Sequence, residues 1–228
     1  MQQAHGPLRS YGRLKSRPIK PRQAQLMDDL LPKIAVDPLA GPIDPLILMP
    51  GAAQAWLEIG FGGGEHLAAQ AARRPDVLVI GVEPFLNGVA SCLRHIDEQG
   101  LGNVRLYPGD ARDLIAALPD ASLDRMFILF PDPWPKTRQQ KRRLIQPQAV
   151  ADFARVLKPG ACLRFATDVA SYADQALMRF NQSGGFAWTA ERADDWRTAP
   201  ADHVATRYEE KRLGDCPPVF LDFVRTDR

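Results

Sequence analysis

The chain has 228 residues, of which 45% are hydrophobic and 25% charged, so it can form one large domain that buries roughly 70–75% of its unfolded surface. Its longest apolar runs, such as residues 126–130, have only five residues, and residues 1–20 lack the apolar segment of a signal peptide. These features exclude a membrane span, and we expect a cytoplasmic protein. Cys92, Cys162 and Cys216 are too widely spaced for a disulfide framework, and no histidine or cysteine set has metal-ligand spacing, so we predict no metal.

The net charge of +2 hides an uneven distribution of charge along the chain. Residues 1–27 carry six basic groups and no acid, and residues 136–143 (KTRQQKRR) carry five basic groups and no acid. The remaining residues hold 18 basic against 27 acidic groups, a net charge of −9. Because phosphates respond to local rather than total charge, this segregation favours a polyanion-binding surface. A solvated tail and a solvated loop are the alternative explanation.

Residues 1–50 are expected to form a basic arm, partly disordered, and an irregular connection, because residues 36–51 hold four prolines and two glycines. We expect one domain over residues 51–228, in which strand and helix patterns alternate. The predicted strands are residues 55–59, 77–83, 103–107, 123–130 and 161–167. The predicted helices are residues 65–74, 85–99, 111–118 and 148–157, the last closed by Lys158, Pro159 and Gly160.

This alternation predicts right-handed crossovers and therefore an α/β fold with a mostly parallel sheet and helices on both faces. The all-apolar residues 126–130 suit a central strand that is buried on both sides. Towards the C-terminus, residues 186–191 and 219–224 both have strand patterns, with no long helix between them. They predict an antiparallel strand at one edge of the sheet.

A glycine-rich loop follows the first predicted strand. Gly60, Gly62 and Gly64 allow a tight turn and let a ligand approach main chain that no side chain shields. The dinucleotide fingerprint needs glycine or alanine at its sixth position, where this chain has Glu65. Because an acid there would repel a pyrophosphate, a nicotinamide oxidoreductase is disfavoured.

Acidic residues end the first three predicted strands, namely Glu58, Glu83 and Asp110. Since open parallel sheets bind ligands at the carboxyl ends of their strands, these acids should surround the glycine loop. S-Adenosylmethionine suits such a site, because it carries a ribose and an adenine but no phosphate. We expect Glu83 to accept the ribose hydroxyl protons, Asp110 to accept a bond from the adenine amino group, and Glu58 to act on the amino acid part.

The fourth predicted strand runs into residues 130–136 (FPDPWPK), whose three prolines stiffen a loop that presents Asp132 and Lys136 at the ligand end. With this loop the sequence resembles the single-subunit bacterial tRNA (guanine-N7-)-methyltransferase family. The shared motifs are LEIGFGGGEHL, GVEP, FPDPWPKTRQQKRR, FATD at residues 165–168 and TRYE at residues 206–209.

The resemblance implies a Rossmann-like class I methyltransferase fold with a seven-stranded sheet. It also implies methyl transfer from S-adenosylmethionine to N7 of the guanine at position 46, in the variable loop of tRNA. With the glycine loop, the cofactor positions are Glu58, Gly60, Gly62, Gly64, Glu83, Asp110 and Asp132, and Asp132 is also the implied catalytic acid. The implied substrate positions are Lys136, Asp168, Thr206, Arg207, Tyr208 and Glu209. The implied RNA-contacting residues are Arg138, Lys141, Arg142 and Arg143.

Guanine N7 has an in-plane lone pair and no proton at neutral pH, so it needs no general base to act as a nucleophile. Holding N7 close to and in line with the methyl group can lower the barrier by on the order of 7–11 kcal/mol. We expect Asp132 and Asp168 to accept hydrogen bonds from the guanine N1–H and amino group. Trp134 either stacks on an exposed guanine or packs under the loop. The alternatives are an amino-group methyltransferase acting on another RNA base or a small amine, and a noncatalytic RNA-binding protein. Monomer and homodimer are both compatible with the sequence.

Overall fold

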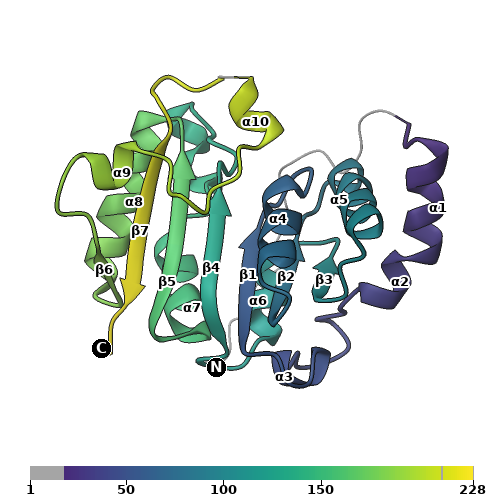
Figure 1. Cartoon of the computed structure of the whole chain (residues 1–228). Helices are drawn as coiled ribbons and strands as arrows, with labels where there is room; N and C mark the ends of the chain where they lie inside the picture. Colours follow the sequence, from purple (N-terminus) through teal and green to yellow (C-terminus); the bar gives the residue numbers. More distant parts are fainter. Residues whose placement is uncertain (1–17, 212, 228) are drawn as a thin grey trace.

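The computed structural model describes residues 18–211 and 213–227, and its centre is a seven-stranded sheet in the order β3-β2-β1-β4-β5-β7-β6 (Figure 1). The strands are β1 (Gln54–Ile59), β2 (Val77–Val82), β3 (Val104–Tyr107), β4 (Leu123–Leu129), β5 (Leu157–Thr167), β6 (Phe186–Trp188) and β7 (Val219–Arg225). The five neighbouring strands β3, β2, β1, β4 and β5 pair in parallel, and β7 is antiparallel to both β5 and β6. The predicted mostly parallel sheet with an antiparallel strand at one edge is confirmed, with short β6 as the outermost strand beyond β7.

Helices cover both faces because the buried strands alternate their side chains between two apolar clusters. In β1, Leu57 and Ile59 belong to one cluster, and Trp56 belongs to the other. The first cluster includes α6 (Ala111–Ala117), α7 (Pro147–Val156) and α8 (Ala170–Ser183). The second includes α4 (Glu65–Arg73) and α5 (Leu86–Gln99). Within the described residues, no helix is long and apolar enough to cross a membrane.

The strand order reverses between β1 and β4, because the chain builds outward through β2 and β3 and then returns to the other side of β1. At such a reversal the loops after the two adjacent strands separate and leave a crevice at their carboxyl ends. The loops after β1 and β4 are the glycine loop and the loop that carries Asp132. The topology therefore brings the two predicted motifs to the same edge of the sheet.

In the described residues before β1 there are three short helices, α1 (Pro21–Asp29), α2 (Leu31–Ile34) and α3 (Pro45–Leu48). Helix α1 packs on α5, where Arg22 forms an ion pair of 2.6 Å with Asp97. The Val36 N–H donates to the Leu106 carbonyl at 2.9 Å, which ties the segment to β3. Residues 21–36 are thus part of the folded body, and the expectation for the arm over residues 1–17 lies outside the described residues.

Strand β5 and several short helices also differ from the sequence-based expectation. Strand β5 begins at Leu157, four residues early, because Leu157 pairs with Leu123 of β4 and a bulge absorbs the Pro159–Gly160 turn. The basic segment forms a short 3-10 helix, η1 (Thr137–Arg142), and two more short helices, α9 (Asp194–Arg197) and α10 (Arg207–Glu210), precede β7. Non-local pairing with β4 decides where β5 begins, whereas a local capping box of Thr206 and Glu209 begins α10.

Candidate active site

The glycine loop after β1 has two functionally different kinds of glycine. Gly60, Gly62 and Gly64 all have positive φ angles, of 74°, 53° and 82°. A Cβ atom added to Gly60 or Gly62 would meet nothing within 4 Å, whereas one on Gly64 would lie 2.5 Å from Cys92 on α5. Gly60 and Gly62 therefore leave open main chain for a ligand, and Gly64 allows α4 and α5 to pack closely.

Glu83, at the end of β2, is buried and holds the glycine loop. Its Oε2 accepts the Gly62 N–H and its Oε1 accepts the Phe85 N–H, both at 2.9 Å. Burial raises the pKa of Glu83, and these main-chain donors partly oppose that shift. Each carboxylate oxygen can accept a second hydrogen bond, so Glu83 suits a pair of ribose hydroxyls.

Gly88 of α5 is a member of this site that sequence analysis missed. A Cβ atom on Gly88 would lie 2.3 Å from the Gly62 carbonyl oxygen, so only glycine lets α5 begin against the loop. The sequence does contain a sign of this role. Gly88 lies in the first turn of the helix after Glu83, a position where a better helix former than glycine is normally preferred.

Glu58, at the end of β1, is buried beneath the glycine loop, and its Oε2 accepts a hydrogen bond from His66 Nδ1 at 2.7 Å. The proton positions follow from Gln70, whose Nε2 donates to the Asp202 carbonyl at 2.7 Å and lies 3.1 Å from His66 Nε2. Because an amide nitrogen only donates, His66 Nε2 must accept and Nδ1 must carry the proton. His66, in the first turn of α4, thus orients the carboxylate of Glu58.

Asp110 follows β3 and caps α6. Its Oδ1 accepts the main-chain N–H of Arg112 at 3.0 Å and the Nε–H of the same residue at 2.8 Å. Burial raises the pKa of Asp110, but these bonds outweigh burial and leave the pKa below its ordinary value. An ionised Asp110 at this strand end is compatible with the predicted bond from an adenine amino group.

The loop after β4 is conformationally strained on both sides of Asp132. Phe130 and Trp134 have positive φ angles of 50° and 40°, which side chains with a Cβ rarely adopt. Asp132 is exposed to solvent, yet the protein around it removes part of its hydration and raises its pKa. Such outliers collect at functional sites, where surrounding structure holds them.

Asp168, after β5, is buried and meets the TRYE segment. Tyr208 Oη donates to Asp168 Oδ1 at 3.4 Å, and burial together with Asp168 and Asp132 raises the pKa of Tyr208 to about 12. A Cβ atom on Gly214 would lie 2.0 Å from the Asp168 carbonyl oxygen, so the chain after α10 also packs here. Asp132, Asp168 and Tyr208 therefore share one end of the sheet.

The four residues of the TRYE segment divide into two pairs. Thr206 and Glu209 form a capping box at α10, and Glu209 also accepts from His203 Nε2 at 2.9 Å. Arg207 and Tyr208 point towards the strand ends, where Arg207 Nε lies 2.9 Å from Glu65 Oε1 beside the glycine loop and Tyr208 meets Asp168. Helix α10 lies over the carboxyl ends of the strands (Figure 1). Thr206 and Glu209 build the turn, while Arg207 and Tyr208 face the crevice.

The basic residues 136–143 differ in exposure to solvent. Lys136, Arg138, Lys141 and Arg142 are exposed, and the Arg142 guanidinium lies over the half-buried Trp134 ring at 5.0 Å from its centroid. Arg143, in contrast, is 2% exposed, and its N–H groups donate to protein oxygens. Its guanidinium faces the interior, so the structure does not favour the expected RNA contact of Arg143.

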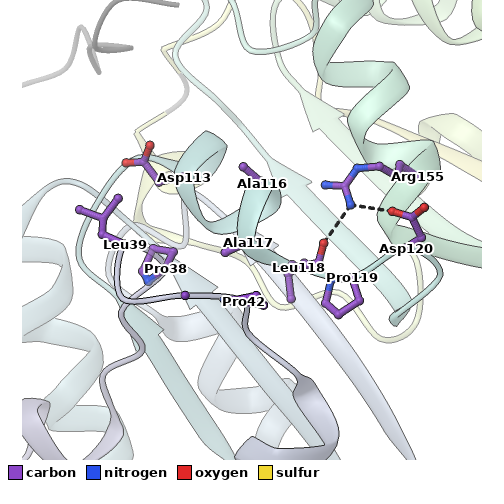
Figure 2. Close-up of a pocket in the computed structure, with 11 residues that line it drawn as sticks. Pro38, Leu39, Pro42, Asp113, Ala116, Ala117, Leu118, Pro119, Asp120 and Arg155 are labelled. Carbon is purple, nitrogen blue, oxygen red and sulfur yellow. Dashed lines mark hydrogen bonds and ion pairs between the residues drawn. The ribbon is translucent and has the colours of Figure 1, made fainter. Parts of the chain in front are cut away.

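A cavity of about 550 Å³ lies at the opposite, amino end of the strands, between residues 38–42 and α6 (Figure 2). Arg155 at its rim donates to Asp120 Oδ1 and to the Leu118 carbonyl, both at 2.9 Å. None of the strand-end acids lines this cavity. In the part of the chain that the structure describes, no group of three or more metal-ligating side chains is found.

Comparison with known proteins supports one family. Residues 52–216 match a family model described as "Putative methyltransferase". The chain is 64% identical over 224 residues to a tRNA (guanine-N(7)-)-methyltransferase of Caulobacter vibrioides, with 98% of each chain covered. A protein of the same name from Hyphomonas neptunium is 56% identical over 216 residues, covering 95% of this chain and 99% of the relative.

Among solved structures, the chain is similar to a variant of the 16S rRNA (adenine(1408)-N(1))-methyltransferase of Catenulisporales acidiphilia with its cosubstrate SAM. The TM-score is 0.56 at 18% identity, and the match covers 84% of this chain and 92% of that chain. This likeness confirms the predicted Rossmann-like class I methyltransferase fold.

Proposed function

The chain belongs to the tRNA (guanine-N(7)-)-methyltransferase family, and we propose how its residues carry out the reaction of that family. The reaction is transfer of a methyl group from S-adenosylmethionine to N7 of a guanine in tRNA, here proposed to be the variable-loop guanine at position 46. The observation that supports it best is that Glu83 holds the open glycine loop after β1, and that the loop with Asp132 follows β4, the neighbour of β1 in the sheet. A nucleoside-binding acid and a base-orienting acid thus share one crevice.

The methyl donor fits the residues at this site. Open main chain at Gly60 and Gly62 suits a ligand that approaches without phosphates, and Glu83 has lone pairs for ribose hydroxyls. His66 holds the Glu58 carboxylate in one orientation under the loop, and Asp110 lies at the next strand end. When bound, S-adenosylmethionine supplies an electrophilic methyl group on a positively charged sulfur. No metal is part of the proposal, because N7 already has a free lone pair.

Asp132 and Asp168 are proposed to orient the guanine rather than to deprotonate it. A carboxylate can accept the guanine N1–H and amino group, which leaves N7 aimed at the methyl group. Adenine lacks both donors, so the same carboxylates discriminate against it. The raised pKa of Asp132 implies that its ionised, accepting form is lost at a higher pH than that of an unperturbed aspartate.

The exposed cations of the basic segment are proposed to bind the tRNA backbone. Lys136, Arg138, Lys141 and Arg142 lie on η1 and the residue before it, directly after the Asp132 loop. Each phosphate contact should contribute about 0.7–0.9 to the slope of log affinity against log salt. The Arg142 guanidinium over Trp134 suggests that this side chain presents the ring to the RNA.

The deciding experiment incubates the protein with labelled S-adenosylmethionine and unmodified tRNA, followed by borohydride reduction and aniline cleavage. Cleavage at the labelled guanosine identifies 7-methylguanosine. Label that appears in tRNA without aniline-sensitive cleavage would instead indicate amino-group methylation. Binding of tRNA without any label transfer would indicate a noncatalytic RNA-binding protein.

Asp132→Ala tests the orienting role. Loss of turnover with retained tRNA affinity is the expected result, because the backbone contacts lie on other residues. Near wild-type turnover with an unchanged pH dependence would contradict the proposal.

A further inference from the structure

Arg143 ends the basic segment, but it is buried, unlike its two preceding neighbours. Its side chain is 2% exposed, whereas Lys141 and Arg142 are exposed. Among the described residues no carboxylate lies within ion-pair distance of its guanidinium. A guanidinium loses its hydration on burial, so its donors must find protein acceptors. The positions of these acceptors show which parts of the structure Arg143 connects.

The guanidinium links the Asp132 loop to α8. Its Nε donates to the Pro133 carbonyl at 2.7 Å. Its Nη1 donates to the Ser171 carbonyl and to Gln175 Oε1, both at 2.9 Å, and its Nη2 donates to Ser171 Oγ at 2.9 Å. The Tyr172 ring lies under the guanidinium, 4.7 Å from it. The planar guanidinium therefore holds Pro133 against α8, which begins two residues after Asp168.

The Asp132 loop needs an external donor of this kind. Pro131, Pro133 and Pro135 have no N–H groups, so the loop has few donors of its own to close a turn. Phe130 and Trp134 hold positive φ angles, which surrounding structure must maintain. Arg143 supplies a short bond to the carbonyl of the residue next to Asp132.

We propose that Arg143 is a positioning residue, which fixes Asp132 relative to Asp168 and does not bind RNA. The inference rests on the proposed function, in which these two acids hold the target guanine. A guanine held by two acids is aimed correctly only while their separation is constant. Misplacement by about 1 Å costs on the order of 100-fold in rate. Two adjacent arginines thus serve different steps, Arg142 in binding and Arg143 in alignment.

The test compares Arg143→Met with Arg142→Met in the full-length protein. For Arg143→Met we expect kcat to fall about 100-fold, with the tRNA Kd, its salt slope and the S-adenosylmethionine Kd unchanged. For Arg142→Met we expect a weaker tRNA Kd and a salt slope smaller by about 0.7–0.9. A weaker tRNA Kd and a smaller salt slope for Arg143→Met, with kcat unchanged, would overturn the proposal.

Two further variants keep the test decisive if Arg143→Met fails to fold. Arg143→Lys retains the charge but loses the planar fork, so kcat should still fall at least about tenfold. Gln175→Met removes one acceptor without altering any basic residue, and kcat should fall about threefold to tenfold at unchanged tRNA Kd. Wild-type kcat in both variants would refute the alignment role. Absence of aniline-sensitive methylation in the wild-type protein would instead overturn the proposed function, and the alignment role with it.

Discussion

Asp202 anchors the segment that leads into α10, and Asp202→Asn is the most informative single substitution in that segment. Its Oδ1 lies 2.6 Å from Arg164 Nη1, and its Oδ2 lies 2.7 Å from Arg125 Nη2. Its carbonyl accepts from Gln70 and Arg73, both at 2.7 Å. The residue therefore ties the TRYE segment to β4, β5 and α4 at once.

The pKa of Asp202 shows how much its two ion pairs stabilise the folded protein. Burial alone would raise this pKa, but the bonds and charges of Arg164 and Arg125 outweigh it and lower the pKa from 3.8 to about 2. At about 1.4 kcal/mol per pKa unit, the difference corresponds to at most about 2.5 kcal/mol. Since 33% of the side chain is exposed, solvent screening reduces the expected stabilisation to about 1–2 kcal/mol.

The sign of the pH dependence follows from the lowered pKa. Because the folded protein binds the proton less tightly than the unfolded chain, the stabilisation is complete above the unfolded pKa of about 3.8. It disappears as the pH falls towards about 2. Urea unfolding should therefore show the wild type about 1–2 kcal/mol more stable than Asp202→Asn at pH 7. The difference should shrink below about pH 4.

Asp76→Asn is a matched control, since Asp76 pairs with Arg74 on the exposed surface. Exposed pairs contribute little, so this variant should unfold with the wild type. A second readout is catalytic, because loosening of α10 should raise the tRNA KM and leave the S-adenosylmethionine Kd unchanged. An Asp202→Asn protein with wild-type stability at pH 7, or with a deficit that stays constant to pH 3, would refute this reasoning.

Three other predictions concern the crevice itself. Glu83→Gln should weaken S-adenosylmethionine binding at least about tenfold in calorimetry with tRNA affinity unchanged, because an amide has one oxygen where two acceptors are used; unaltered binding would contradict the ribose role. Gly64→Ala should lower the free energy of unfolding by about 1–3 kcal/mol, since its Cβ atom would lie 2.5 Å from Cys92. Gly60→Ala adds a Cβ atom that meets no neighbour, so it should be destabilised only by the backbone strain of about 1–2 kcal/mol at its positive φ, less than Gly64→Ala, and should also affect cofactor binding; equal destabilisation by both alanines would show that packing against Cys92 is not the cause. The raised pKa of Asp132 predicts an acid limb in the pH dependence of kcat at a higher pH than an unperturbed aspartate would give, and this limb should be absent in Asp132→Asn.

The acids after the strands were predictable because their placement depends on local pattern and topology. A carboxylate that ends a strand of a parallel sheet must lie at one edge, whatever the details of packing. Glu58, Glu83, Asp110 and Asp132 therefore all reach the same end of the structure. The roles of these acids toward the ligands remain predictions.

The buried polar contacts around that edge were not predictable. Asp202 and His66 are far apart in sequence, and the structure joins them through Gln70 of α4, which lies 3.1 Å from His66 Nε2 and donates to the Asp202 carbonyl. Helices α1 and α2 were missed for a related reason. Their sequences are polar and rich in proline, and they are held by packing on α5 and by the bond to β3.

The sequence by itself determined the family, the α/β alternation and the set of charged residues that gather at the carboxyl edge, because each depends on residue order and period alone. The tertiary structure decided which member of each set faces ligand and which faces protein. Gly60 is open while Gly64 packs against Cys92, and Arg142 is exposed while Arg143 is buried. Adjacent arginines at the end of a short 3-10 helix differ only in what lies opposite them. The partner of Arg143 is α8, 28 residues further along the chain at Ser171, and no local pattern records that contact.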